Sequence, residues 1–133
     1  MAEIHHRIGI QASVQEVYGA LTTNKGLQSW WTNDVTGAGG IGAVIQFRFN
    51  GGGPDFEVVG LEEQKQVHWR HSGTTPEEWV ESEIIFQLDE EKNQTIVRFS
   101  HMKWAQATDF MAHCSTKWAV FLLSLKDALE TGK

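Results

Sequence analysis

Apolar and polar residues alternate along much of the chain, with the period of two that is typical of a half-buried strand. Ile4, Ile8 and Ile10 share one face of a strand over residues 3–10. The same period returns five times between residues 43 and 101, and short turns rich in Gly, Pro, Asn or charged residues separate the segments. The predicted strands are 43–49, 56–61, 67–71, 78–88 and 95–101. Short local turns of this kind predict an antiparallel meander.

Helical spacing interrupts this pattern near both ends of the chain. Ser13 and Glu16 have the spacing of a capping box and predict a short helix after the first strand. Asn24 is predicted to cap a second short helical turn that leads to Trp30 and Trp31. Residues 108–130 repeat apolar side chains at spacings of three and four, which predicts a long amphipathic helix ended by Gly132.

These elements predict one α+β domain over residues 1–133. We expect a curved antiparallel sheet of about six or seven strands wrapped around the long C-terminal helix, with two short helices after the first strand. A sheet and a single helix do not fill the space between them, so a cavity is expected there. Strand parity and the apolar helix stripe predict its lining, with the two adjacent tryptophans at the mouth: Trp30, Trp31, Phe47, Phe49, Trp69, His71, His101, Trp104, Phe110, Met111, Cys114 and Trp118.

Composition narrows the function classes. The 133 residues carry a formal net charge of −6, which disfavours nucleic acid as a partner. The single cysteine excludes an intrachain disulfide, no stretch is apolar enough to span a bilayer, and the alternating N-terminus does not resemble a signal peptide. We therefore expect a cytoplasmic protein. Six Trp and seven Phe beside one Tyr favour either a ligand pocket or a bulky core.

Two motifs for bound groups do not fit their surroundings. Residues 37–42 match the pattern G-x-G-x-x-G, but a strand follows them instead of the helix that a dinucleotide site requires. The six histidines offer no locally chelating pair, and only His71 and His101 are expected to approach each other across the sheet. No cofactor and no metal are therefore predicted. Glu81 and Glu83 share a strand face that is expected to look at solvent.

His101 and Cys114 each allow two interpretations. An inward His101 either orients a ligand or acts as a general base, or else it is a structural histidine bonded within the fold. Cys114 lies on the apolar helix stripe, where it is either a nucleophile beside a base such as His113 or a small buried hydrophobe. The residues alone favour no catalytic set.

The chain resembles the START-like (Bet v 1-like, SRPBCC) superfamily, and most closely the branch similar to the C-terminal domain of the activator of Hsp90 ATPase. The resemblance is carried by Trp30-Trp31, by Phe99-Ser100-His101 and by the C-terminal pattern Trp118-x-x-Phe121-Leu122-x-Ser124-Leu125-Lys126-x-x-Leu129-Glu130-x-Gly132. It implies a helix-grip fold around a cavity between sheet and helix. Members of this superfamily differ widely in function, so the resemblance constrains the chemistry much less than the fold.

Three functions remain open. The first is a carrier or sensor that binds a small hydrophobic or aromatic ligand in the cavity. The second is an enzyme of the cyclase, dehydratase or hydrolase type that uses the same cavity, as some similar proteins do, with His101 as its base. The third is a module that binds an Hsp90-type chaperone, which is disfavoured because the N-terminal domain of the eukaryotic activators is not expected here. Exposed strand edges also allow a homodimer.

Overall fold

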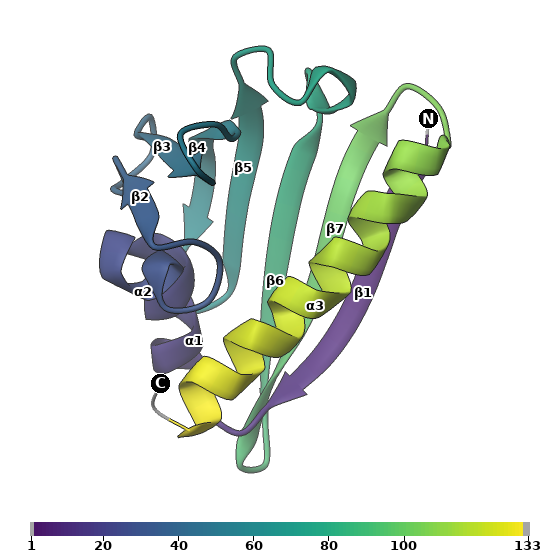
Figure 1. Cartoon of the computed structure of the whole chain (residues 1–133). Helices are drawn as coiled ribbons and strands as arrows, with labels where there is room; N and C mark the ends of the chain where they lie inside the picture. The colour runs from purple at the N-terminus through teal and green to yellow at the C-terminus, as the bar shows by residue number, and fades with distance from the viewer. Residues whose placement is uncertain (1, 132–133) are drawn as a thin grey trace.

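A computed structural model describes residues 2–131 as one seven-stranded antiparallel sheet with helices on its concave side (Figure 1). The strand order is β1-β7-β6-β5-β4-β3-β2, so the sheet is a meander that β1 extends at one edge. The elements are β1 Ala2–Ile10, α1 Val14–Thr22, α2 Asn24–Gln28, β2 Asp34–Thr36, β3 Val44–Arg48, β4 Asp55–Glu62, β5 Gln66–Ser72, a 3₁₀ turn η1 Glu77–Trp79, β6 Glu83–Glu91, β7 Gln94–Trp104 and α3 Asp109–Thr131. The predicted α+β helix-grip fold is confirmed.

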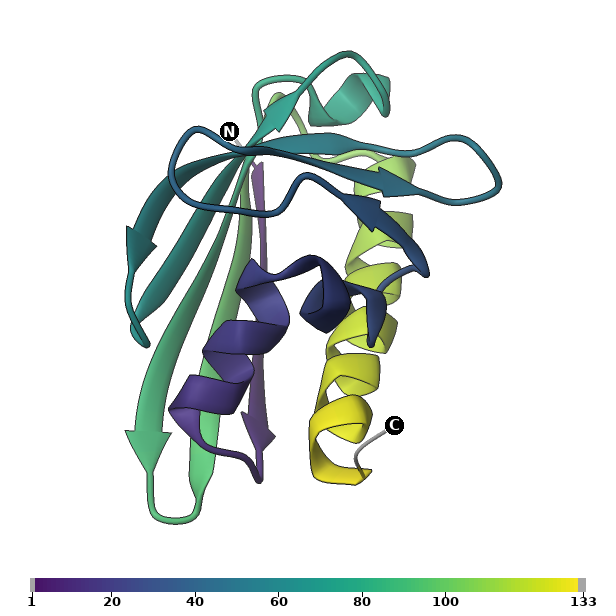
Figure 2. The ribbon, with the colours of Figure 1, turned by 90° about the vertical axis from the view of Figure 1, so that its left-hand side faces the viewer.

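The long helix α3 crosses the concave face of the sheet, and the helix pair α1–α2 covers the part of that face that α3 leaves open (Figures 1 and 2). On the inner side of α3, Cys114, Trp118, Leu122 and Leu125 are buried, as the helical spacing predicted. Gly132, the predicted end of this helix, lies outside the described residues. No helix within residues 2–131 has the length and hydropathy needed to cross a membrane.

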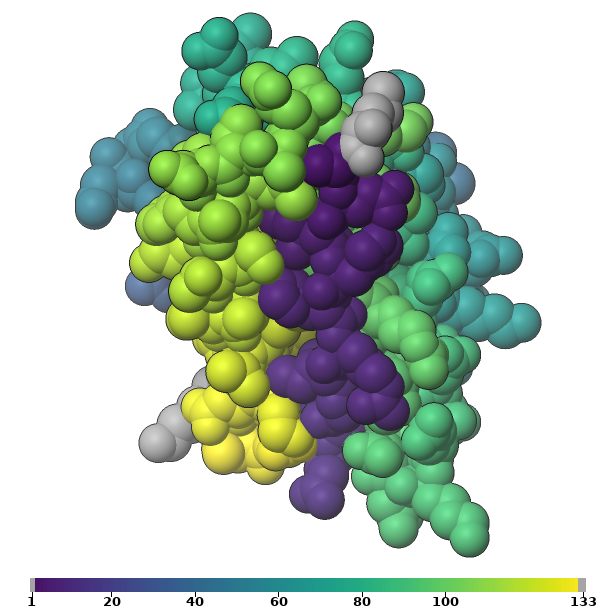
Figure 3. Space-filling model, turned by 90° about the vertical axis from the view of Figure 1, so that its right-hand side faces the viewer, coloured from purple at the N-terminus to yellow at the C-terminus, as the bar shows by residue number. Residues whose placement is uncertain are grey.

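The free edge of β1 lies beside α3, and Figure 3 shows the two elements in contact along this side of the molecule. Polar contacts join them at both ends. The imidazole of His6 lies 3.1 Å from the backbone oxygen of Ser115, and the ammonium of Lys126 donates to the backbone oxygen of Gly9 at 2.7 Å. These contacts fix the position of the helix over the sheet.

The two N-terminal helices form where the sequence indicated, with one difference in capping. Ser13 and Glu16 make the predicted capping box. The second helix is capped by Thr23, whose hydroxyl accepts the backbone N–H of Gly26, and not by Asn24. The Asn24 side chain instead accepts the backbone N–H of Ala38 at 2.9 Å and ties down the glycine-rich loop.

The strand predicted over residues 78–88 begins later, at Glu83. Trp79 lies in the 3₁₀ turn and is buried, whereas Val80 is 43% exposed. Glu81 has a positive φ of 67° and lies outside the strand, so the predicted pair of carboxylates on one strand face does not exist. The Glu83 side chain is only 13% exposed and pairs with His68 and Lys103.

Two strand boundaries also differ from the alternation pattern. The edge strand β2, Asp34–Thr36, is too short for a period of two to reveal it. Strand β7 continues three residues beyond His101 to Trp104, with a register shift against β1 near Ala2 and Ile4 and a positive φ at Lys103. Phe49 lies just outside β3 at the tip of the β3–β4 hairpin, where it is 39% exposed.

An aromatic cleft between the long helix and the β3–β4 hairpin

One hollow of the described residues is lined largely by apolar side chains and has a volume of about 360 Å³. We call it the aromatic cleft. Four segments form it: the N-terminal half of α3, the tip of the β3–β4 hairpin, the stretch that leads into and through η1, and Trp31 after α2. Its lining residues are Trp31, Phe49, Gly53, Pro54, Pro76, Trp79, Phe110, His113, Cys114, Lys117, Trp118 and Phe121. The other hollows of comparable or larger volume are lined mainly by polar and charged side chains. The aromatic cleft is therefore the place where an apolar ligand loses most contact with water.

Trp31 is at the centre of the aromatic packing around the cleft. Its ring centroid lies 5.0 Å from that of Trp118 and 5.8 Å from that of Phe121, both on α3. On the sheet side it lies 4.1 Å from Phe47. Such tilted ring pairs are individually worth about 0.5–1.5 kcal/mol beyond the area they bury. Trp31 thus links α2, the sheet and the long helix.

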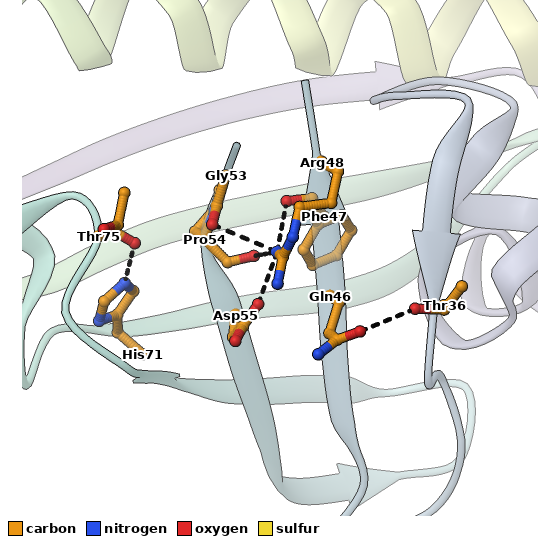
Figure 4. Close-up of polar contacts among 9 residues, drawn as sticks. All are labelled: Thr36, Gln46, Phe47, Arg48, Gly53, Pro54, Asp55, His71 and Thr75. Atoms are coloured by element: carbon orange, nitrogen blue, oxygen red, sulfur yellow. Dashed lines mark hydrogen bonds and ion pairs between the residues drawn. The ribbon is translucent and has the colours of Figure 1, made fainter. Parts of the chain in front are cut away.

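Arg48 holds the hairpin that forms one wall of the cleft. Its guanidinium Nη1 donates to Asp55 Oδ1 at 2.7 Å and to the backbone oxygens of Phe47, Gly53 and Pro54 at 2.9–3.4 Å (Figure 4). The chain passes very close to itself here, because a Cβ on Gly53 would lie 2.1 Å from the oxygen of Phe47. The glycine and the arginine together set the position of the hairpin tip.

We expect Arg48→Leu to lower the free energy of unfolding by about 1–2 kcal/mol, because it removes partly buried charge-assisted hydrogen bonds. It should also speed amide hydrogen exchange at residues 49–54. The matched control is Arg98→Leu, which breaks an exposed pair with Asp89 and should cost about 0–1 kcal/mol. Equal costs for the two variants would contradict the role given to Arg48.

Five of the twelve residues predicted for the cavity line this cleft: Trp31, Phe49, Phe110, Cys114 and Trp118. The other seven do not: Trp30, Phe47, Trp69, His71, His101, Trp104 and Met111. Most of these seven are core residues. For example, Trp69 is 1% exposed, and the Trp30 indole donates to the backbone oxygen of Ala20 at 2.9 Å.

The structure adds lining residues that the sequence did not indicate. Phe121 lies three positions after Trp118 on the same apolar stripe, so the helical period alone contained enough information to find it. Lys117 and His113 lie at the exposed rim of the cleft, where periodicity gives no indication. Trp79 was hidden because it was assigned to a strand instead of the 3₁₀ turn that directs it inward.

His101 is buried beneath the cleft and both of its ring nitrogens are engaged. Trp118 Nε1 donates to His101 Nδ1 at 3.2 Å, and His101 Nε2 lies 2.8 Å from the Ser82 hydroxyl. An indole nitrogen only donates, so Nδ1 must be the acceptor and Nε2 carries the proton. Burial, and secondarily the nearby His71, lowers the pKa of His101 to about 3. These features favour the structural interpretation of His101.

His71 lies near His101, with Trp79 packed against both rings, but the two histidines do not form a metal site. Its Nε2 donates to the backbone oxygen of Thr75 at 2.8 Å, and burial lowers its pKa (Figure 4). The indole of Trp79 packs edge-on against both His71 and His101, with centroid distances of 6.2 and 4.9 Å. Residues 2–131 contain no group of three or more His, Cys, Asp or Glu placed to hold a metal ion.

Cys114 has the environment of an unreactive thiol. Burial raises its pKa, the indole of Trp79 acts in the opposite direction, and the charge of Glu78 adds to the rise. A thiolate is the reactive form, so a raised pKa reduces its population near neutral pH. The environment of Cys114 therefore favours its interpretation as a small buried hydrophobe over that of a nucleophile.

A family model described as activator of Hsp90 ATPase homolog 1-like protein matches residues 11–130, which is most of the chain. The chain belongs to this family. The match includes all the cleft residues and the helix-grip elements around them. A search of curated proteins gave no match.

One solved structure supports the same assignment, and two more distant ones share the fold. An Aha1 protein from Colwellia psychrerythraea, solved as a dimer, is 62% identical, with a TM-score of 0.93 and coverage of 100% of this chain and 99% of that one. A Mesorhizobium loti protein shares the fold at 18% identity, with a TM-score of 0.86 and 99% coverage of both chains. A putative protein of the dynemicin biosynthetic locus is 24% identical, with a TM-score of 0.83 over 98% of this chain and 48% of that one.

Proposed function

We propose that this chain binds a small hydrophobic or aromatic molecule in the aromatic cleft and acts as a carrier or sensor of it. The observation that carries this proposal is an apolar hollow of about 360 Å³ walled by six aromatic rings. Known small-molecule sites have volumes of about 300–1,000 Å³ and mostly apolar walls with a few polar groups. The aromatic cleft has both properties.

The chemistry of the cleft supports binding over catalysis. The sequence suggested His101 as a general base, but with a pKa of about 3 it is a poor proton acceptor near neutral pH. His101 is not among the lining residues, and two of the rings that do line the cleft, Trp79 and Trp118, pack against it. No Asp or Glu lines the cleft. A cyclase or hydrolase would need a proton acceptor or donor in contact with its substrate, and the one imidazole that lines the cleft, that of His113, lies at its exposed rim.

A second candidate function rests on the family. The matching family is described by its similarity to an activator of Hsp90 ATPase, and the 62% identical Colwellia protein is called Aha1 and is a dimer. We therefore also consider binding to an Hsp90-type chaperone, and we propose a homodimeric state for this chain. Sedimentation analysis tests the dimer, and a binding assay with a purified Hsp90-type chaperone tests the partner.

The ligand proposal predicts saturable binding of N-phenyl-1-naphthylamine, a neutral dye whose emission rises in apolar sites. Phe49→Asp should weaken this binding by about tenfold or more, because it replaces an apolar wall with a charge. Both Phe49 and Ile41 are exposed hydrophobics, at 39% and 68%, but only Phe49 lines the cleft. Ile41→Asp is therefore the matched control and should leave the affinity unchanged. Equal loss in both variants, or no saturable binding, would refute the proposal.

A further inference from the structure

The polar groups that line the aromatic cleft fall into two sets, those already bonded within the protein and those left free. The backbone oxygens of Gly53 and Pro54 accept hydrogen bonds from Arg48, and the oxygen of Pro76 accepts from the backbone N–H of Trp79 at 3.0 Å. The indole N–H of Trp118 is used by His101. Each of these three backbone oxygens therefore already accepts a hydrogen bond before any ligand arrives.

The buried side-chain groups left free are hydrogen-bond donors, whereas the imidazole of His113 lies at the exposed rim. The Nε1 atoms of Trp31 and Trp79 are buried and have no hydrogen-bond partner among the described residues, although each tryptophan as a whole is only 7% exposed. The thiol of Cys114 near the Trp79 indole is a weak acceptor and does not replace a hydrogen bond to oxygen. A buried donor without a partner carries a desolvation cost. A ligand oxygen recovers that cost once the side chains that cover the N–H shift to admit it.

The positive charge of Lys117 at the rim of the cleft, like the free N–H donors, attracts a hydrogen-bond acceptor or an anion. Lys117 lies at the exposed rim of the cleft, and its ammonium makes no ion pair with any described residue. The chain has 17 acidic against 11 basic residues, yet none of the acidic side chains lines the cleft. The nearby carboxylate of Glu78 accepts the hydroxyl of Thr108 at 2.6 Å. A cleft free of carboxylates in an acidic protein suits an anion.

We propose that the ligand of the aromatic cleft is a small ring-bearing carboxylate, whose ring lies among the aromatic walls and whose oxygens accept from the free donors. This inference rests on the proposed binding function and specifies its ligand class. Carboxylate oxygens satisfy N–H donors and the ammonium at once, because an ionised carboxylate only accepts. A ligand whose polar group only donates hydrogen bonds leaves the indoles of Trp31 and Trp79 unsatisfied.

The test compares three probes of one shape by calorimetry at neutral pH: naphthalene-2-carboxylate, 2-methylnaphthalene and 2-naphthylmethylammonium. The expected order of affinity is carboxylate above methyl above ammonium, with at least about tenfold between the first and the last. If all three bind equally, or the ammonium binds best, the carboxylate inference is wrong while the binding function stands. If none binds and the neutral dye also fails, the proposed function itself is wrong.

Two variants locate the donors. Lys117→Met should weaken the binding of naphthalene-2-carboxylate by about threefold to fivefold, the range of an exposed ion pair. It should leave the affinity for 2-methylnaphthalene unchanged. Lys92→Met removes the same charge from the exposed β6–β7 turn and should alter neither affinity. Trp31→Phe keeps a ring but deletes the N–H. It should weaken the binding of naphthalene-2-carboxylate by about tenfold more than it weakens the binding of 2-methylnaphthalene. Carboxylate binding unaffected by both cleft variants would overturn the inference.

Discussion

Replacing Trp118 with Ala should lower the free energy of unfolding by about 3–5 kcal/mol, the usual range for deleting a large buried aromatic side chain. Trp118 is 2% exposed, and its ring lies within 4.6 Å of Phe99 and 5.0 Å of Trp31, measured between centroids. It joins α3 to the sheet and to the segment after α2. The substitution also removes the hydrogen bond to His101 Nδ1 and leaves that buried acceptor unpaired.

Two further variants separate these contributions. Trp118→Phe keeps most of the packing and loses only the N–H, so a cost of about 1–3 kcal/mol is expected, as for one buried group left unsatisfied. Val120→Ala changes an exposed position on the same helix and should cost about 0.5 kcal/mol or less. Urea denaturation measures all three. A loss below about 1 kcal/mol for Trp118→Ala would contradict its place in the core.

The fold was predictable because its elements are encoded by local periodicity. The capping box at Ser13 and the apolar stripe of α3 each lie within a few turns of one helix, and both appear in the structure as predicted. The errors arose where tertiary contacts override the local pattern. Residues 78–82 alternate like a strand, but the positive φ at Glu81 turns the backbone there and leaves Val80 exposed.

The candidate site was less predictable than the fold. Alternation along a strand shows on which face of the sheet a side chain lies, but not how deeply that side chain is buried. Phe47 and Trp69 do face the helix side, but other rings cover them, and both are at most 1% exposed. Phe49 has the same parity as Phe47 and reaches the cleft only because it lies at the hairpin tip. Which of several inward aromatic residues meets a ligand depends on packing between distant segments.

The polar character of the cleft was beyond sequence reasoning for a related cause. A tryptophan in a sequence carries one N–H donor, but whether that donor has a partner depends on the fold. Here the indoles of Trp30 and Trp118 are bonded within the protein, whereas those of Trp31 and Trp79 are not. The unpaired indole donors of the cleft, which suggest a carboxylate ligand, therefore become visible only when its tryptophans are placed in the fold.

His101 should make the protein markedly less stable in acid. Its pKa is about 3 in the folded protein, against 6.5 for an unperturbed imidazole. Between these values the unfolded chain binds a proton that the folded chain does not, so stability falls as the pH falls. The contribution of His101 to the free energy of unfolding is complete above about pH 6.5. It is lost progressively as the pH falls to about 3, below which it no longer changes. At about pH 4 the expected loss is on the order of 3 kcal/mol.

The comparison that isolates this effect is urea denaturation of the unmodified protein and His101→Phe over the same pH range. The variant lacks the titrating group, so it is less stable at neutral pH but should lose less stability on acidification. Burial also lowers the pKa of His71. For Glu83, burial raises the pKa, but the hydrogen bonds and charges of Lys103 and His68 outweigh it and lower the pKa, so both groups add to acid sensitivity. The difference between the two curves therefore reports His101 together with its electrostatic coupling to His71. Parallel curves from neutral pH to about pH 4 would mean that His101 takes up its proton in the folded state near its ordinary pKa, which would restore it as a candidate base.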